Sequence, residues 1–178
     1  MTDPESLREK AELALTTLGA RPELLAERNL PLFPDASELV IARVSASGRE
    51  YELVPKAAAQ WIKLRSAAIN DGVTVLVLSG YRGFDRQFEL INSKVEAGEL
   101  INEILAVMAP PGCSEHHTGR AVDVGTPGCE RLSETFAETA AFRWLAVNAA
   151  EYGFRLSFPP NNRWGYQYEP WHWCYHNE

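Results

Sequence analysis

The chain has 178 residues, of which 46% are hydrophobic, enough for one core domain with a short N-terminal appendage. Its net charge of −7 and pI near 5.2 argue against nucleic-acid partners, which require clusters of basic residues. No apolar run reaches the length of about eighteen residues that a membrane span needs, and the acidic start of the chain lacks the pattern of a secretory signal. We therefore expect a cytoplasmic protein without membrane partners.

Residues 1–35 are predicted to form a helix and a connecting segment. Asp3 can cap a helix that begins at Pro4 and continues to about Thr17. An apolar stripe at helical spacing supports this helix: Leu7, Ala11, Leu15 and Leu18. The segment that follows is rich in proline and has no clear periodicity. We therefore assign the main domain to residues 36–178.

The first part of the main domain is predicted to contain a hairpin, a helix and a strand. Glu38–Val44 and Glu50–Val54 flank a short turn rich in serine and glycine, a pattern typical of a β-hairpin. Pro55 favours the first turn of a helix that ends before Gly72. Val73–Leu78 is almost entirely apolar, which favours a buried strand over an exposed edge.

The rest of the chain alternates helices with short strands. Helices are predicted over Asp85–Glu96, Leu100–Met108 and Ser133–Tyr152. Strands are predicted over Arg120–Val124, Phe154–Phe158 and Trp171–Tyr175. This order of elements predicts an α+β fold, in which helices pack on a small, mainly antiparallel sheet.

Two segments in the second half of the chain carry side chains suited to metal chemistry. The first contains His116 and Asp123, and the second contains Glu169 and His172. A catalytic zinc site uses three protein ligands and leaves the fourth position for water. The two histidines and Asp123 can supply these ligands, which leaves Glu169 as a general base. The combination points to metal-assisted hydrolysis.

Asp123 is the most informative of these residues. It lies between two valines on an apolar strand, where an unpaired carboxylate is unfavourable, so a metal or a hydrogen-bond network must compensate its charge. Glu169 and His172 are three positions apart and would point to opposite faces of a regular strand. A bend at Pro170 would bring both to one point. Without that bend, the pair is a core histidine and a surface glutamate.

The chain also contains three cysteines: Cys113, Cys129 and Cys174. Their odd number and the absence of CxxC spacing fit reduced thiols better than a disulfide framework. Cys113 and Cys174 are close in sequence to His116 and His172, respectively. We expect them to fill space near the site rather than to bind metal.

Three motifs in chain order resemble one known signature. The first comprises Ser114, His116, Gly119, Ala121 and Asp123, the second Glu169, Trp171 and His172, and the third Ser79–Arg82 with Gln87 after it. This pattern resembles that of VanY-type zinc D-Ala carboxypeptidases, a family that includes D,D- and L,D-carboxypeptidases of bacterial cell-wall metabolism. The resemblance covers roughly residues 50–175.

The resemblance implies a role for each matched residue. His116, Asp123 and His172 would bind one Zn²⁺ per chain, and Glu169 would be the base that deprotonates the attacking water. Arg82 would assist the same step or bind substrate, since a guanidinium suits both an oxyanion and a carboxylate. The positions that match substrate-contacting residues of the family are Tyr81, Gln87 and Ser114.

Two positions are not explained by the family pattern. Many relatives carry an Arg-Tyr-Pro stretch whose tyrosine hydroxyl helps to hold substrate, whereas this chain has Ser157, Phe158 and Pro159. Phe158 cannot donate that hydrogen bond, so the departure concerns substrate preference rather than hydrolysis. His117 occupies a variable position of the motif, and we expect it to face solvent or to support the ligands.

The substrates implied by the resemblance are peptidoglycan stem peptides or muropeptides, from which a terminal D-Ala is released. A D,D enzyme would cleave pentapeptides that end in D-Ala-D-Ala, whereas an L,D enzyme would cleave tetrapeptides. Because we expect a cytoplasmic protein, we favour an L,D-carboxypeptidase that processes recycled tetrapeptides and keep the D,D enzyme as the alternative. A zinc-bearing module that binds cell-wall peptides without cleaving them is a third hypothesis, but it would not need Glu169.

Overall fold

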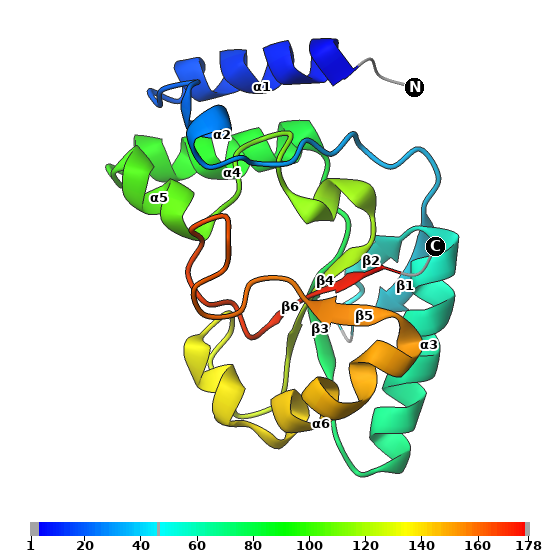
Figure 1. The fold of residues 1–178 in the computed structure, drawn as a ribbon. Coiled ribbons are helices and arrows are strands. Elements are labelled where there is room, and N and C mark those ends of the chain that lie inside the picture. Colours follow the sequence, from blue (N-terminus) through cyan, green and yellow to red (C-terminus); the bar gives the residue numbers. More distant parts are fainter. Residues whose placement is uncertain (1–3, 46, 177–178) are drawn as a thin grey trace.

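The computed structural model describes residues 4–45 and 47–176 (Figure 1). Asp3, the predicted helix cap, and part of the predicted hairpin turn lie outside the described residues. The helices are α1 (Pro4–Thr17), α2 (Leu24–Glu27), α3 (Pro55–Asn70), α4 (Phe84–Glu96), α5 (Ile101–Val107) and α6 (Ala140–Asn148), with 3-10 helices η1 (Glu115–Thr118), η2 (Glu134–Glu138) and η3 (Ala149–Tyr152). The strands are β1 (Val40–Val44), β2 (Glu50–Leu53), β3 (Leu76–Ser79), β4 (Ala121–Gly125), β5 (Phe154–Leu156) and β6 (His172–Tyr175). Across the described residues, no helix has the length and apolar character of a membrane span.

The strands form two antiparallel sheets, which confirms the predicted α+β fold. β1 and β2 make the predicted hairpin, and the other four strands form a sheet in the order β3-β4-β6-β5. In the larger sheet, Asp123 of β4 pairs with His172 at the start of β6 and with Ser79 at the end of β3. The centre of this sheet therefore joins residues from all three sequence motifs.

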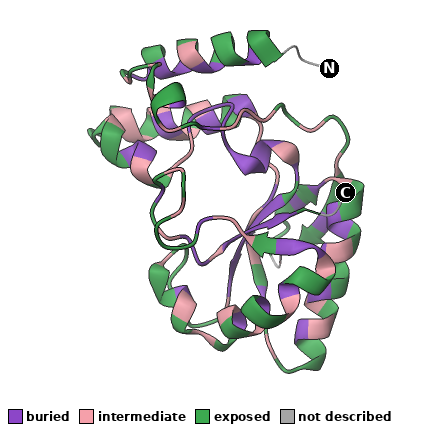
Figure 2. Ribbon diagram, in the orientation of Figure 1, coloured by how far each residue is buried: buried purple, intermediate pink, exposed green. Residues whose placement is uncertain are grey.

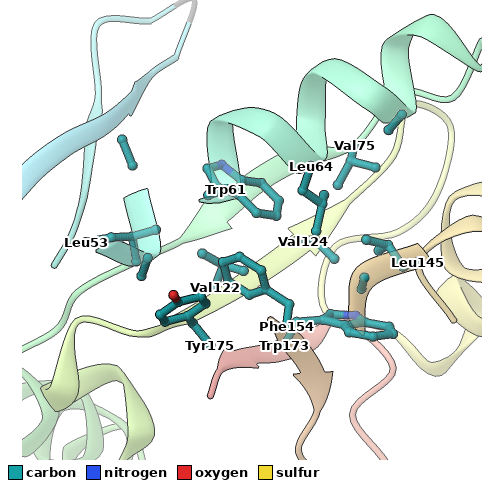
Figure 3. Close-up of a cluster of buried hydrophobic side chains, with 14 of the residues drawn as sticks. Leu53, Trp61, Leu64, Val75, Val122, Val124, Leu145, Phe154, Trp173 and Tyr175 are labelled. Carbon is teal, nitrogen blue, oxygen red and sulfur yellow. The ribbon is translucent and has the colours of Figure 1, made fainter. Parts of the chain in front are cut away.

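The two faces of the larger sheet have different roles. Val122 and Val124 of β4 and Trp173 and Tyr175 of β6 point into the main hydrophobic core, which α3 and α6 cover (Figures 1 and 3). Because side chains alternate along a strand, Asp123 and its β6 partner point to the opposite face. Packing on one face thus fixes the position of the polar side chains on the other.

A second hydrophobic core lies on the far side of the site. It combines apolar residues of α1, α4 and α5 with aromatic residues that precede β6. Figure 2 marks buried positions on α1, α4 and α5 in purple. The members that α1 contributes are Leu7, Ala11, Ala14 and Leu15. The stripe predicted for the N-terminal helix is therefore buried against α4 and α5. The connecting segment after α1 also contains the short helix α2, which sequence periodicity did not predict.

The apolar segment Val73–Leu78 differs from its prediction. The strand is limited to Leu76–Ser79, and it lies at the edge of the sheet rather than inside it. Val73, Val75 and Val77 pack on the main core, as alternation requires, whereas Leu76 points outward and is 37% exposed. Apolar side chains on the outer face, including the partly exposed Leu76, made an edge strand resemble a buried one.

The predicted helix Ser133–Tyr152 is divided into three pieces, η2, α6 and η3. Thr139 has an extended backbone, and its side chain accepts a hydrogen bond from the amide of Phe142, which starts α6 anew. Within α6, Leu145 is buried, whereas Val147 is 77% exposed.

Candidate metal centre

His116, Asp123 and His172 converge at the centre of the larger sheet. His116 Nε2 lies 3.2 Å from Asp123 Oδ2, and His172 Nδ1 lies 3.0 Å from Asp123 Oδ1. One ligand atom from each residue lies within 4.8 Å of the others, and all three side chains are buried. The three residues predicted as metal ligands are therefore brought together.

Local backbone geometry places His116 in this cluster. The Ser114 hydroxyl caps η1 by accepting a hydrogen bond from the His116 amide. Gly119 ends η1 with a positive φ of 64°, and a Cβ there would lie 2.9 Å from Leu39 Cδ2 and 3.2 Å from the Val54 amide nitrogen. Only glycine fits this turn without strain, so it determines how the chain passes from His116 into β4.

A tight turn places Glu169 beside His172. The amide of His172 donates to the carbonyl oxygen of Glu169 at 3.1 Å, and Pro170 lies inside this turn. As a result, Glu169 Oε2 lies 3.8 Å from His172 Nδ1, and the Glu169 side chain is buried. The bend predicted at Pro170 is confirmed, and the opposite-face arrangement of a regular strand does not occur.

The outer nitrogens of both histidines are held by hydrogen bonds. His116 Nδ1 lies 2.7 Å from the carbonyl oxygen of Gly80, and His172 Nε2 lies 3.0 Å from Glu115 Oε2. When each outer nitrogen donates to its acceptor, His116 Nε2 and His172 Nδ1 are left to face Asp123. Such support is typical of metal-binding imidazoles. The donor set of two nitrogens and one carboxylate fits Zn²⁺.

The charges at the centre also favour a cation. Burial opposes ionisation of Asp123, but the neighbouring His116 and His172 outweigh it and lower the pKa of Asp123. Burial likewise opposes the charged form of His172, but hydrogen bonds to Asp123 and Glu115 raise the pKa of His172 to about 10. Two buried carboxylates therefore share one imidazole, and either a proton or a metal ion can supply the compensating positive charge.

Glu169 has the properties of a general base. Burial is the main cause that raises its pKa, the carboxylates of Asp123 and Glu115 add to this, and together they outweigh His172 and Arg82 to bring the pKa of Glu169 to about 7. A carboxylate with such a pKa can accept and return a proton near neutral pH. Within the cluster, Glu169 can therefore carry protons without serving as a ligand.

A cavity of about 420 Å³ lies beside these residues. Its wall includes Arg82, Ser114, Phe158, Tyr166 and Glu169. By contrast, the two other positions predicted to contact substrate are not among the described residues that line it. Gln87 is fully buried and donates to the carbonyl oxygen of Ala109, whereas the backbone amide of Tyr81 donates to the hairpin. Arg82 and Ser114 are thus the predicted substrate-contacting positions that reach this cavity.

Glu115 belongs to the site, although no sequence motif predicts a role for it. Its Oε2 accepts hydrogen bonds from His172 Nε2 and from the Ser157 hydroxyl. Burial opposes its charge, but these bonds and the nearby imidazoles lower the pKa of Glu115 to about 2. The only signal in the sequence was an acidic residue next to a predicted ligand, which neither periodicity nor motif spacing distinguishes from a surface position.

His117 and Phe158 also have defined places. His117 is fully buried, with Nδ1 2.6 Å from the carbonyl oxygen of Arg82 and Nε2 accepting a hydrogen bond from the Gly112 amide. It supports the chain that carries Arg82 and does not face solvent. The centroid of the Phe158 ring lies 4.7 Å from that of the His172 ring. Phe158 therefore packs between the candidate metal ligands and the second hydrophobic core.

The family model described as VanY, D-alanyl-D-alanine carboxypeptidase, matches residues 50–178. The chain belongs to the VanY family. This VanY-family chain is 37% identical to the putative carboxypeptidase YodJ of Bacillus subtilis (strain 168), over 82% of its own length and 56% of YodJ. It is 34% identical to a D-alanyl-D-alanine carboxypeptidase of Enterococcus faecalis, over 63% of its own length and 44% of that protein. The chain thus spans about half the length of these relatives.

Solved structures confirm the fold. The chain aligns with the LdcB LD-carboxypeptidase at a TM-score of 0.71 and 35% identity, covering 82% of this chain and 71% of LdcB. It aligns with a mutant of the D,D-pentapeptidase VanY in complex with Zn(II) at a TM-score of 0.62 and 31% identity, covering 82% of both chains. Both an L,D and a D,D enzyme therefore share the fold of this VanY-family chain, and one of them binds zinc.

Proposed function

We propose that the protein is a zinc-dependent carboxypeptidase that releases the terminal D-Ala of peptidoglycan stem peptides. The observation that supports this most directly is the convergence of His116, Asp123 and His172 beside Glu169, at the wall of a cavity. Three ligands and one free carboxylate with a pKa near neutrality suit hydrolysis better than binding alone. A module that only binds cell-wall peptides would have no need for a buried carboxylate next to His172, as Glu169 is.

Zn²⁺, when bound by the three ligands, supplies Lewis-acid polarisation of the scissile carbonyl. Glu169 takes a proton from the attacking water and returns it to the amine of the departing D-Ala. Arg82 lies in the cavity wall, where its guanidinium neutralises the developing oxyanion or the substrate carboxylate. Phe158 and Tyr166 belong to the apolar part of the wall, which excludes water around the reacting groups.

For the bond that is cleaved, we propose L,D specificity, with tetrapeptides as substrates. Likeness to the LdcB LD-carboxypeptidase supports this assignment. The D,D alternative is supported by likeness to VanYB in complex with D-alanine-D-alanine, at 32% identity and a TM-score of 0.62. Phe158 packs against His172 and has no hydroxyl group. The pocket must therefore hold its substrate without the hydrogen bond that a tyrosine at this position would donate.

Separate incubation with tetrapeptide and pentapeptide muropeptides distinguishes the two activities. Mass spectrometry of released D-Ala should show release from the tetrapeptide, and removal of zinc by a chelator should abolish it. Release from the pentapeptide alone would contradict L,D specificity and establish the D,D alternative. Binding of both muropeptides by the zinc-loaded protein without release of D-Ala would instead support the non-catalytic module.

A further inference from the structure

A second group of possible metal ligands lies on the other side of Glu115. Glu115, Cys174 and His176 each offer one ligand atom, and these atoms lie within 4.8 Å of one another. Cys174 and Glu115 are buried, whereas His176 is exposed. The ligand atoms of this group thus lie within the same 4.8 Å of one another as those of the candidate zinc centre, but the group opens to solvent.

Strand geometry explains why these residues meet. His172, Cys174 and His176 alternate along the chain, so β6 directs His172 and Cys174 to the same face, with His176 continuing this alternation beyond the strand. Glu115, at the first position of η1, lies over this face and already contacts His172. Oε2 of Glu115 accepts hydrogen bonds from His172 and Ser157, and the same carboxylate lies within hydrogen-bond reach of the Cys174 thiol, so a metal ion would take the place of the thiol proton.

Contrary to the space-filling role expected for Cys174 from the sequence, we propose that Glu115, Cys174 and His176 form a second metal site next to the first, which takes Zn²⁺ or another borderline-soft divalent cation. A thiolate, an imidazole and a carboxylate are ligands that Zn²⁺ accepts, and the thiolate disfavours Mg²⁺ and Ca²⁺. The exposure of His176 lets a water molecule complete four-coordination. On binding, the Cys174 thiol releases its proton to solvent, and its sulfur lone pair forms the bond to the ion.

The second site differs from the first in one property that can be measured. The candidate zinc centre contains only nitrogen and oxygen ligands, whereas the second site contains a thiolate. Co²⁺ or Cd²⁺ bound at Cys174 therefore gives a sulfur-to-metal charge-transfer band in the ultraviolet, and the same ions at His116, Asp123 and His172 do not. The band reports the second site independently of any hydrolytic activity.

The test is a titration of the metal-free full chain with Co²⁺ and Cd²⁺, followed by absorbance and by metal analysis. The wild type should bind two ions per chain, one of which produces the thiolate band. Cys174→Ser should bind one ion without the band. Cys129→Ser removes a thiol outside the group and should behave as the wild type. His176→Ala alters an exposed side chain and should weaken the band-producing site at least tenfold, even if Cys174→Ser fails to fold.

Two results would overturn the second site: a wild type that binds one ion without a thiolate band, or a band that persists unchanged in both Cys174→Ser and His176→Ala. Either result would leave the proposed hydrolytic function intact if the zinc-loaded wild type still released D-Ala. Conversely, two bound ions with a thiolate band but no release of D-Ala would support the second site and count against the carboxypeptidase.

Discussion

Asp123 and Glu169 are buried carboxylates of the same site, but their surroundings give them different chemistry. Asp123 lies between two imidazoles that hold its pKa below the usual range, so it remains anionic, as the proposed metal ligand must be. Among the described residues, Glu169 contacts one imidazole, at 3.8 Å, and burial is the main cause that raises its pKa to about 7. The difference in neighbours suits one carboxylate to the proposed ligand role and the other to the proposed base role.

The proposed role of Glu169 as the general base can be tested with Glu169→Gln. The amide keeps the size of the side chain but cannot accept the proton of the attacking water, so kcat for D-Ala release should fall about 10²- to 10⁴-fold. Zinc content, measured by atomic absorption, should remain that of the wild type, because Glu169 lies outside the proposed ligand set. Loss of zinc together with activity would instead show that Glu169 binds the metal.

The convergence of the three proposed ligands was easier to predict than the residues that support them. His116, Asp123 and His172 were identified from donor type, spacing and the improbability of an unpaired carboxylate on an apolar strand. Glu115 and the fully buried His117 are defined by contacts with Ser157 and Arg82, respectively, which are distant in the chain. No local sequence pattern indicates such contacts, so the hydrogen bonds that support the proposed ligands could be identified only from the structure.

Among the elements, η1 is the one whose geometry determines the site. It is short, and its position depends on the Ser114 cap at one end and on the left-handed Gly119 at the other. The element boundaries that the sequence misplaced have similar local causes. An extended Thr139 divides a predicted helix, and outward apolar side chains such as Leu76 made an edge strand look central. Periodicity cannot identify either effect, because both depend on individual residues.

Gly119→Ala and Gly72→Ala form a matched pair that tests the importance of the η1 turn. Both glycines have positive φ, which costs about 1–2 kcal/mol for alanine. A Cβ at Gly72 meets no atom within 4 Å, whereas one at Gly119 approaches Leu39 and the Val54 backbone. Urea unfolding should show a larger loss of stability for Gly119→Ala, and a zinc-binding titration should show weaker binding only for that variant. Equal losses with unchanged zinc affinity would mean that the turn does not position His116.

In the whole molecule, the site lies between two hydrophobic cores. One core packs beneath the larger sheet, and the other joins α1, α4 and α5 to the aromatic residues near the cavity. The α+β class and most elements could be predicted from periodicity and turn residues. The division into two cores could not, because it depends on how helices distant in sequence pack together.

The N-terminal helix offers a test of whether residues 1–35 fold with the main domain. Leu15 is fully buried in the second core, whereas Leu13 on the same helix is 67% exposed. We propose that the segment is an integral part of the fold, so Leu15→Ala should lower the free energy of unfolding by about 2–5 kcal/mol. Leu13→Ala should change it by about 0.5 kcal/mol or less. The free energies of unfolding can be measured by tryptophan fluorescence in urea. Values equal to that of the wild type for both variants would contradict this proposal.

The pairing of Asp123 with His172 across β4 and β6 has a consequence for folding. A slip of one residue between these strands would turn one set of side chains to the other face, separating the two ligands and exposing valines or Trp173. An ion that needs both ligands can therefore bind tightly only after the strands have paired in the native alignment. Metal binding would therefore stabilise the sheet only in its native strand register. Intermediates with misaligned strands would gain no such stabilisation and would unfold again.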